Sequence, residues 1–182
     1  GSIQASGAVF GAVDPVGGWN GIYCYQYIQS SLLSGCTIRD VNSSPNGAVT
    51  INCSTLFALQ NCIFTNNNNY GLYCFNGKNF SLTSCTFTGN AKTVGIYAGD
   101  IQKLLAGNVY AGNTENRIHC LGGTIGSAAS WTAHSTPIWV SAHINFNTDG
   151  AQLLVIPSGV ELQFDSGKYF YVGDPNYSSQ LP

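Results

Sequence analysis

Apolar and polar residues alternate in short runs along the first two-thirds of the chain, and the runs recur. One phrase joins a glycine or a polar residue to alternating apolar and ring-bearing residues, and its copies lie at residues 21–25, 49–53, 71–75, 95–99 and 117–120. A second phrase follows each of the first four copies, and it begins at Leu33, Leu59, Leu82 and Leu105. Alternation with a period of two predicts β-strands with one face inside, and helical periodicity is not evident.

The second phrase fixes the length of the repeat. Its fourth residue recurs at positions 36, 62, 85 and 108, so each repeat is about 23–26 residues long, within the range of solenoids whose repeats stack as coils. Within one repeat the parity of the inward residues changes after Leu82, so the chain must bend at residues 83–84, which gives three short strands per coil. We expect one core layer to contain Leu72, Cys74, Phe80, Leu82, Cys85 and Phe87, with Ile96, Leu105 and Tyr110 stacked on it from the next coil.

Two details of the repeat carry further expectations. Lys103 falls where Phe80 stands one coil earlier, so it must either turn outward or mark a local register shift. Turn triplets at residues 65–67, 88–90 and 111–113 all end in asparagine, and Gly and Asn tolerate left-handed backbone. We therefore expect an amide ladder along the solenoid axis. Its members are Asn67, Asn90 and Asn113. The alternative for the run 66–69 is a low-complexity, aggregation-prone segment.

These repeats resemble the right-handed parallel β-helix family, the pectate-lyase-like solenoids. Coils of that family often carry a phrase of an apolar residue, then Cys or Asn, then an aromatic residue, then Gly-Asn, and residues 20–122 match it as about five coils. The resemblance implies an all-β parallel β-solenoid, with residues 1–19 as an N-terminal edge segment and residues 123–182 as a β-rich cap or further coils. It implies little about function, because the same solenoid carries lyases, hydrolases, tailspikes, adhesins and structural proteins.

The composition excludes several functions. Only 8% of the 182 residues are charged, against about 25% in an ordinary soluble protein. A net charge of −2 without a basic stripe argues against nucleic acid as a partner, and no apolar run approaches the roughly 20 residues of a membrane span. The carboxylates do not cluster, so we predict no catalytic site, no metal site and no cofactor. The Asp100–Lys103 and Glu115–Arg117 pairs are expected to be solvated surface charges.

Seven cysteines in so weakly charged a chain favour an exported, oxidising setting. The first three coils carry one cysteine in each phrase, and the fourth coil lacks both, which favours disulfides within a coil. The expected pairs are Cys24 with Cys36, Cys53 with Cys62, and Cys74 with Cys85. A column of reduced, buried cysteines and pairing between adjacent coils remain open alternatives. Cys120 has no counterpart in a second phrase, so we expect an intermolecular bond or a free thiol there.

Two functions from different classes fit these features. The first is a non-enzymatic extracellular or cell-surface protein that assembles with itself into a sheath, surface layer or filament. Low charge, open strand edges and the odd cysteine favour it, and the composition weakly resembles the amyloid-like sheath proteins of filamentous archaeal methanogens. The second is a carbohydrate-binding or polysaccharide-degrading module of a larger secreted protein, with a glycan as its partner. Trp131 and Trp139 flank Pro137 in the C-terminal segment, and we expect them to pack at a junction rather than form a sugar platform.

Overall fold

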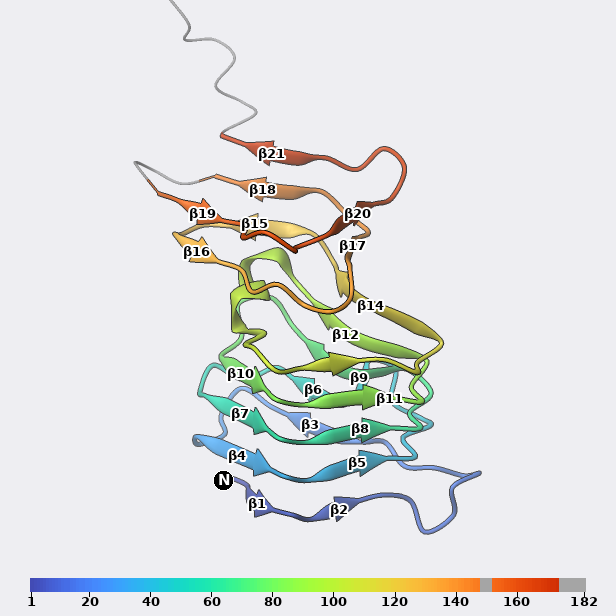
Figure 1. Cartoon of the computed structure of the whole chain (residues 1–182). Helices are drawn as coiled ribbons and strands as arrows, with labels where there is room; N and C mark the ends of the chain where they lie inside the picture. Colours follow the sequence, from blue (N-terminus) through green and yellow to red (C-terminus); the bar gives the residue numbers. More distant parts are fainter. Residues whose placement is uncertain (148–151, 174–182) are drawn as a thin grey trace, which may run out of the picture.

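The chain winds into a stack of parallel β-coils (Figure 1). The computed structural model describes residues 1–147 and 152–173. Its largest sheet has seven strands, one from each coil, so the described part of the chain makes about seven turns rather than the expected five. The all-β parallel solenoid predicted from the repeats is therefore confirmed.

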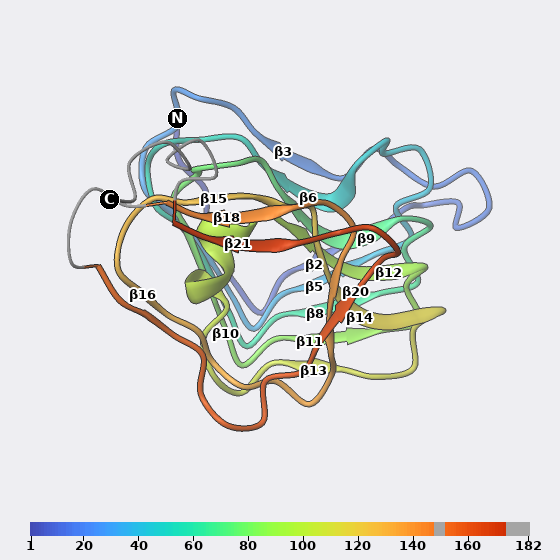
Figure 2. The same cartoon turned by 90° about the horizontal axis from the view of Figure 1, so that it is seen from above.

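Three sheets form the walls of the stack and enclose one core (Figure 2). The seven-stranded sheet contains β3 (Ile22–Cys24), β6 (Gly47–Ile51), β9 (Tyr70–Cys74), β12 (Lys92–Ile96), β14 (Glu115–Cys120), β17 (Ile138–Val140) and β20 (Leu162–Phe164). The five-stranded sheet contains β2 (Val9–Phe10), β5 (Thr37–Arg39), β8 (Ile63–Thr65), β11 (Thr86–Thr88) and β13 (Val109–Tyr110). The four-stranded sheet contains β1 (Gln4–Ser6), β4 (Ser31–Ser34), β7 (Phe57–Gln60) and β10 (Phe80–Thr83).

Both terminal segments continue the solenoid. Strands β1 and β2 pair in parallel with β4 and β5, so the expected N-terminal edge segment at residues 1–19 contributes two strands to the first coil. At the other end, β17 and β20 from the expected cap or further coils at residues 123–182 extend the seven-stranded sheet in parallel. Two smaller parallel sheets accompany them, one of β15 (Gly123–Ile125), β18 (Ile144–Phe146) and β21 (Phe170–Val172), the other of β16 (Ala129–Ser130) and β19 (Leu154–Val155).

Single residues in left-handed conformation turn each coil at its corners. The bend expected at residues 83–84 lies at Ser84, whose φ is 53°, between β10 and β11. Gly35, Asn61 and Gly107 occupy the same corner in other coils, also with positive φ. A second corner column, between the five-stranded and the seven-stranded sheet, contains Asp40, Asn66, Gly89 and Gly112, all with positive φ. Because a left-handed residue reverses the inward parity, the side chain that follows each corner points into the core.

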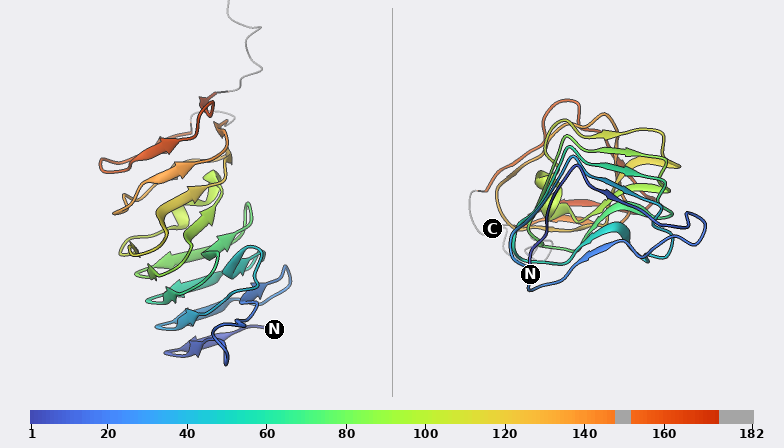
Figure 3. Two further views of the ribbon diagram at one scale, coloured as in Figure 1. Left: turned by 90° about the vertical axis from the view of Figure 1, so that its right-hand side faces the viewer. Right: turned by 90° about the horizontal axis from the view of Figure 1, so that it is seen from below.

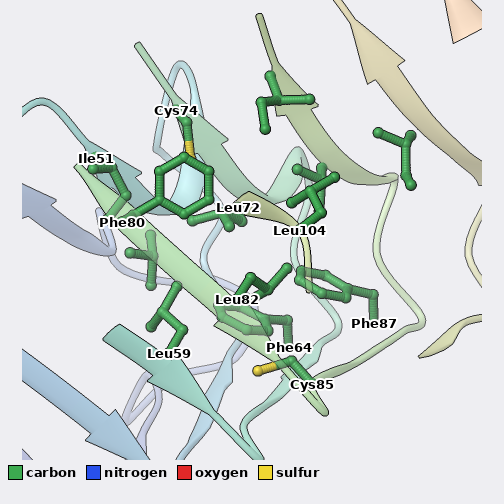
Figure 4. Packing of buried hydrophobic residues seen from close by; sticks show 14 of the residues in the cluster. Ile51, Leu59, Phe64, Leu72, Cys74, Phe80, Leu82, Cys85, Phe87 and Leu104 are labelled. Atoms are coloured by element: carbon green, nitrogen blue, oxygen red, sulfur yellow. The ribbon is translucent and has the colours of Figure 1, made fainter. Parts of the chain in front are cut away.

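The predicted core layer is confirmed with one exception (Figure 4). All its other members, from Leu72 to Tyr110, are at most 2% exposed. Leu105, however, is 41% exposed, and Leu104 takes the inward position through a parallel bridge to Leu82. The expected register was therefore wrong by one residue in this coil.

A short 3₁₀ helix explains the shifted register. Helix η1 (Ala98–Lys103) lies directly before Leu104, and in this coil the column of the four-stranded sheet continues through the isolated bridge between Leu104 and Leu82. Lys103 turns away from the core, and its Nζ donates to Asp100 Oδ1 at 2.7 Å and to the carbonyl of Lys78. Asp100 is only 2% exposed and also accepts the N–H of Gly77 at 2.7 Å. This pair is thus a buried anchor of η1, not the solvated pair expected.

Candidate functional site: internal ladders, outer face and open ends

The predicted asparagine ladder is present at the second corner of the coils. Asn67 Nδ2 donates to Asn90 Oδ1 at 2.7 Å, and Asn90 Nδ2 donates to Asn113 Oδ1 at 2.9 Å. The Oδ1 atoms of Asn90 and Asn113 also accept the backbone N–H of the asparagine one coil below, and the Oδ1 of Asn67 accepts the N–H of Val41. Each Nδ2 reaches a backbone carbonyl one coil below, as Asn90 does with Phe64 at 2.9 Å. The ladder thus satisfies backbone groups that the corner leaves without strand partners.

A column of cysteines at the first corner makes hydrogen bonds of the same pattern. The thiol of Cys62 donates to the carbonyl of Leu33 at 3.3 Å, and the Sγ of Cys85 accepts the N–H of Cys62 at 3.4 Å. Asn108 stands next in the column, where its Oδ1 accepts the N–H of Cys85 at 2.9 Å and its Nδ2 donates to the carbonyl of Leu82. Cysteine therefore serves at this corner as a smaller substitute for asparagine.

The expected disulfides within a coil are not formed. All seven cysteines are buried free thiols, and Cys74 and Cys85 lie at opposite ends of the core cluster, with Leu72 and Leu82 between them (Figure 4). The paired loss of cysteine in the fourth coil accompanies other local changes, because Ala98 begins helix η1 and Asn108 takes over the ladder position. The structure therefore matches the alternative of reduced, buried columns.

Cys120 is also buried within its own chain. Its side chain is 0% exposed, because β17 covers β14 with Val140 directly in register with Cys120. Burial raises the pKa of this thiol to about 11. Cys120 is thus the free thiol of the two predicted alternatives, and a bond to another chain would require β17 to detach.

Substituting the cysteine column tests its resemblance to the asparagine ladder. We expect Cys85→Asn to retain stability within about 1 kcal/mol, because its amide can repeat the bonds of Asn108, whereas Cys85→Ala should cost about 1–3 kcal/mol by leaving the N–H of Cys62 unsatisfied. Urea denaturation of both variants measures the difference. An alanine variant as stable as the asparagine variant would show that the column acts only as apolar filling.

The thiols should react slowly in the native state. Burial raises the pKa of Cys24 to about 12, with the nearby Cys53 thiol adding to the effect, and burial also raises that of Cys74. A hydrogen bond with Cys85 instead lowers the pKa of Cys62 to about 7, but all seven thiols are buried, so we expect Ellman's reagent at pH 8 to label almost no cysteine in the native chain and all seven in denaturant without reductant. Fewer than seven thiols in denaturant would reveal disulfides in the purified protein.

The outer face of the seven-stranded sheet carries a row of aromatic side chains. One outward column runs in register through Tyr23, Thr50, Tyr73, Gly95, His119, Trp139 and Gln163. At the N-terminal end of this face, Tyr23 lies 4.5 Å from Tyr25 between ring centroids, and both rings are exposed. Of the two tryptophans expected to pack, Trp131 is 2% exposed in the core, whereas Trp139 lies on this face.

Several of the few charged residues gather farther along the same face around His119. The His119 ring is 1% exposed, its Nδ1 lies 3.2 Å from the Tyr70 hydroxyl, and its Nε2 lies 3.3 Å from Glu115 Oε2. Arg117 pairs with Glu115 at 2.9 Å and stacks 4.0 Å above the Trp139 ring. The Glu115–Arg117 pair is thus part of a partly buried network. Sequence reasoning missed it, because Tyr70 and His119 are 49 positions apart.

This network predicts that stability falls in acid. Burial lowers the pKa of His119 to about 4, an effect that Lys92 and Arg117 reinforce and Glu115 opposes. The unfolded chain therefore binds the proton near pH 6.5, before the folded chain does, and folding free energy is lost as the pH falls from 6.5 towards 4. The loss should approach roughly 3 kcal/mol below pH 4.

Urea titrations between pH 7 and 4 measure this loss. His119→Gln can keep the contact with Tyr70 and should flatten the profile. It should not abolish the slope, because burial also lowers the pKa of His134. An unchanged profile in the variant would contradict the assignment to His119.

The first coil is open at its outer edge (Figure 3). Within residues 1–147 and 152–173, no strand pairs with the outer edges of β1, β2 and β3. A cavity of about 310 Å³ opens at this end, and apolar side chains dominate its lining. Its lining includes Ile3, Ile22, Cys24, Ile28 and Phe57.

The last described coil is uncovered in the same way. Phe164 and Val172 belong to inward columns, in register with the buried Val140 and the partly buried Phe146. They are nevertheless 39% and 77% exposed, because no further strand covers β20 and β21 among the described residues. Both ends of the described solenoid thus present apolar core positions and unpaired strand edges.

Nothing in the described part of the chain groups three or more His, Cys, Asp or Glu side chains in a way that suits a metal ion. No helix among these residues has the length and apolar character to cross a membrane.

A family model described as "Right handed beta helix region" matches residues 14–132, which is more than half of the chain. Neither a curated protein nor a solved structure matches the chain.

Proposed function

We propose, from the premise that this chain belongs to the right-handed β-helix family, that it is a non-enzymatic structural protein acting outside the cell or at its surface. Its partner is itself, and it assembles by stacking its terminal coils into a filament, sheath or layer. The observation that carries this proposal is the outer edge of the first coil, where β1, β2 and β3 have no strand partner among residues 1–147 and 152–173 and border a mainly apolar cavity of about 310 Å³.

The physics of exposed edges supports this function. A parallel strand without a neighbour presents free N–H and C=O groups that can pair with another chain, and soluble proteins usually block such edges with charges, proline or a covering segment. Strands β1, β2 and β3 contain no charged residue and no proline. The side chains of Val9, Val13 and Val16 in the same coil are more than 60% exposed. These features favour association over a monomeric state.

Sedimentation velocity over a range of concentrations, without reductant, tests the proposal. The wild-type chain should form species of increasing mass. Val9→Pro should reduce assembly, because the carbonyl of Ala8 accepts the N–H of Thr37, so the N–H of the next residue, Val9, faces the open end. Val9→Ala is the matched control, since it shortens the same side chain and keeps the N–H. A wild-type chain that stays monomeric at high concentration would refute this function.

Carbohydrate binding is the second candidate, and the two exposed tyrosines at the N-terminal end of the aromatic row support it. Tyr23 and Tyr25 lie side by side on the outer face and are 43% and 68% exposed, as sugar-stacking rings would be. Affinity electrophoresis in gels that contain soluble polysaccharides tests this candidate. Binding should slow the wild-type chain and not Tyr25→Ala, with Tyr169→Ala, an exposed tyrosine outside this row, as the control. Equal mobility in all gels would exclude the candidate.

A further inference from the structure

We infer that copies of the chain stack head to tail in one register, with β20 of one copy pairing in parallel with β3 of the next. This inference rests on the proposed self-assembly and specifies its interface. It places Leu162 opposite Ile22, Gln163 opposite Tyr23 and Phe164 opposite Cys24 of the neighbouring copy. The seven-stranded sheet then continues across the contact without interruption.

At the two open edges, the residues whose backbone N–H and C=O groups point outward are the ones that this register requires. The carbonyl of Cys24 accepts the N–H of Asn52, so alternation along β3 directs the N–H and C=O of Tyr23 to the open end. In β20, the carbonyl of Glu161 and the N–H of Asp165 bond to β17, so the groups of Leu162 and Phe164 face the open end. The N–H of Tyr23 can thus donate to Leu162, and the N–H of Phe164 can donate to Tyr23.

The side-chain columns also continue in this register. One inward column runs from Ile22 through Leu72 to Leu162, and the next runs from Cys24 through Cys74 to Phe164. Stacking a second copy extends each column by one more inward side chain of the same kind as those already in the column. A shift by one residue would place Gln163 against an inward position and bury its amide without a partner.

The first coil has room for the apolar ring that the last described coil leaves uncovered. The cavity at the first coil holds about 310 Å³ and is lined by Ile22 and Cys24, whereas a cavity of about 150 Å³ already accommodates a benzene ring. Phe164 is the inward ring left uncovered on β20, and the register places it directly beneath Cys24. Seating this ring in the cavity would remove both apolar surfaces from water.

Contact between two first coils would not reproduce this arrangement. A two-fold axis between identical ends would set β3 against β3 of the partner in antiparallel orientation, which breaks the parallel ladder and its columns. Head-to-tail contact is heterologous, so it propagates into filaments. Whether the first coil of one copy contacts the last coil or the first coil of another therefore distinguishes this inference from self-assembly of any other geometry.

Two edge-blocked variants test the polarity. Tyr23→Pro removes the N–H that faces outward on β3, and Phe164→Pro removes the one on β20; Tyr23→Phe and Phe164→Leu are the matched controls that keep both N–H groups. Each proline variant alone should remain monomeric, because its intact end has no intact counterpart. An equimolar mixture should form a heterodimer of twice the monomer mass, measured by light scattering after size exclusion.

The outcomes distinguish this inference from the proposed function. A wild-type chain that never assembles refutes both. If wild type assembles and Phe164→Pro by itself forms dimers, the contact joins two first coils. This result would overturn the register and leave self-assembly standing. Assembly of both proline variants to the wild-type extent would overturn it as well.

A cross-link provides a readout that does not depend on proline. The double variant Tyr23→Cys/Gln163→Cys places two outward thiols opposite each other across the contact, within the Cα separation that a disulfide spans. Diamide should join them into covalent multimers by accepting two electrons and two protons per bond. Tyr25→Cys/Gln163→Cys is two residues out of register and should remain largely monomeric on a non-reducing gel. Equal cross-linking of the two variants would overturn the register.

Discussion

Replacing Phe87 by alanine is expected to destabilise the solenoid by about 3–5 kcal/mol, one of the two largest effects we predict for a single side chain. Phe87 is 0% exposed and forms the middle of a ring stack, with ring centroids 4.6 Å from Phe64 and 5.3 Å from Tyr110. Its loss would leave a cavity between two coils and interrupt both ring contacts. The cavity cannot collapse easily, because backbone hydrogen bonds hold β8, β11 and β13 at fixed spacing.

Urea denaturation measures this effect, and two variants provide controls. Phe87→Leu keeps most of the apolar volume and should recover more than half of the loss. Ile63→Ala removes an apolar side chain that is 42% exposed on the neighbouring β8, and should cost much less. If Phe87→Ala and Ile63→Ala were equally stable, β11 could not have the inward parity described here.

Replacing Asn90 by alanine is expected to cost roughly 3–5 kcal/mol, because each buried polar group left without a partner costs about 1–3 kcal/mol. Asn90 is 1% exposed and holds the centre of the amide ladder. Its side chain bonds to both neighbouring asparagines and to the carbonyl of Phe64. Alanine would leave this carbonyl and the amides of Asn67 without their partners in a water-free corner.

The matched control is Asn68→Ala. Asn68 is exposed in the same asparagine run, and only its backbone N–H bonds to the coil below, at the carbonyl of Val41. The unfolding free energy of the Asn68→Ala variant should therefore stay within about 0.5 kcal/mol of that of wild type. Thermal and urea unfolding of both variants distinguish a specific ladder from a merely polar turn. Similar stability for the two would contradict the ladder.

The repeats predicted the fold because the information that sets it is local. Period-two alternation defines the strands, and parity changes such as that between Leu82 and Cys85 locate the corners. The ladder at Asn90 was predictable because its members recur at one position of the repeat. Residues 1–19 lack the repeated phrase, so their strands could be recognised only from pairing with β4 and β5.

The remaining features depend on distances between coils that a sequence does not contain. A cysteine in each phrase of a coil suggested a bond, yet the core side chains between Cys74 and Cys85 keep these thiols apart. The one-residue shift at Leu104 follows from helix η1, and an alternating pattern gives no sign of a 3₁₀ turn. The open ends could be expected from the sequence. Which residues direct their N–H and C=O groups outward there could be learned only from the observed hydrogen bonds.

Helix η1 also divides the molecule mechanically. The four-stranded sheet ends at β10 and the five-stranded sheet at β13, whereas the seven-stranded sheet runs from β3 to β20. One wall is therefore continuous and stiff, while the opposite side has a seam at the level of η1. Bending of the solenoid should therefore open or close the gap at the level of η1, while the seven-stranded sheet stays intact and serves as the hinge. A filament built from such units would curve in one preferred direction, with the seams on the side that opens.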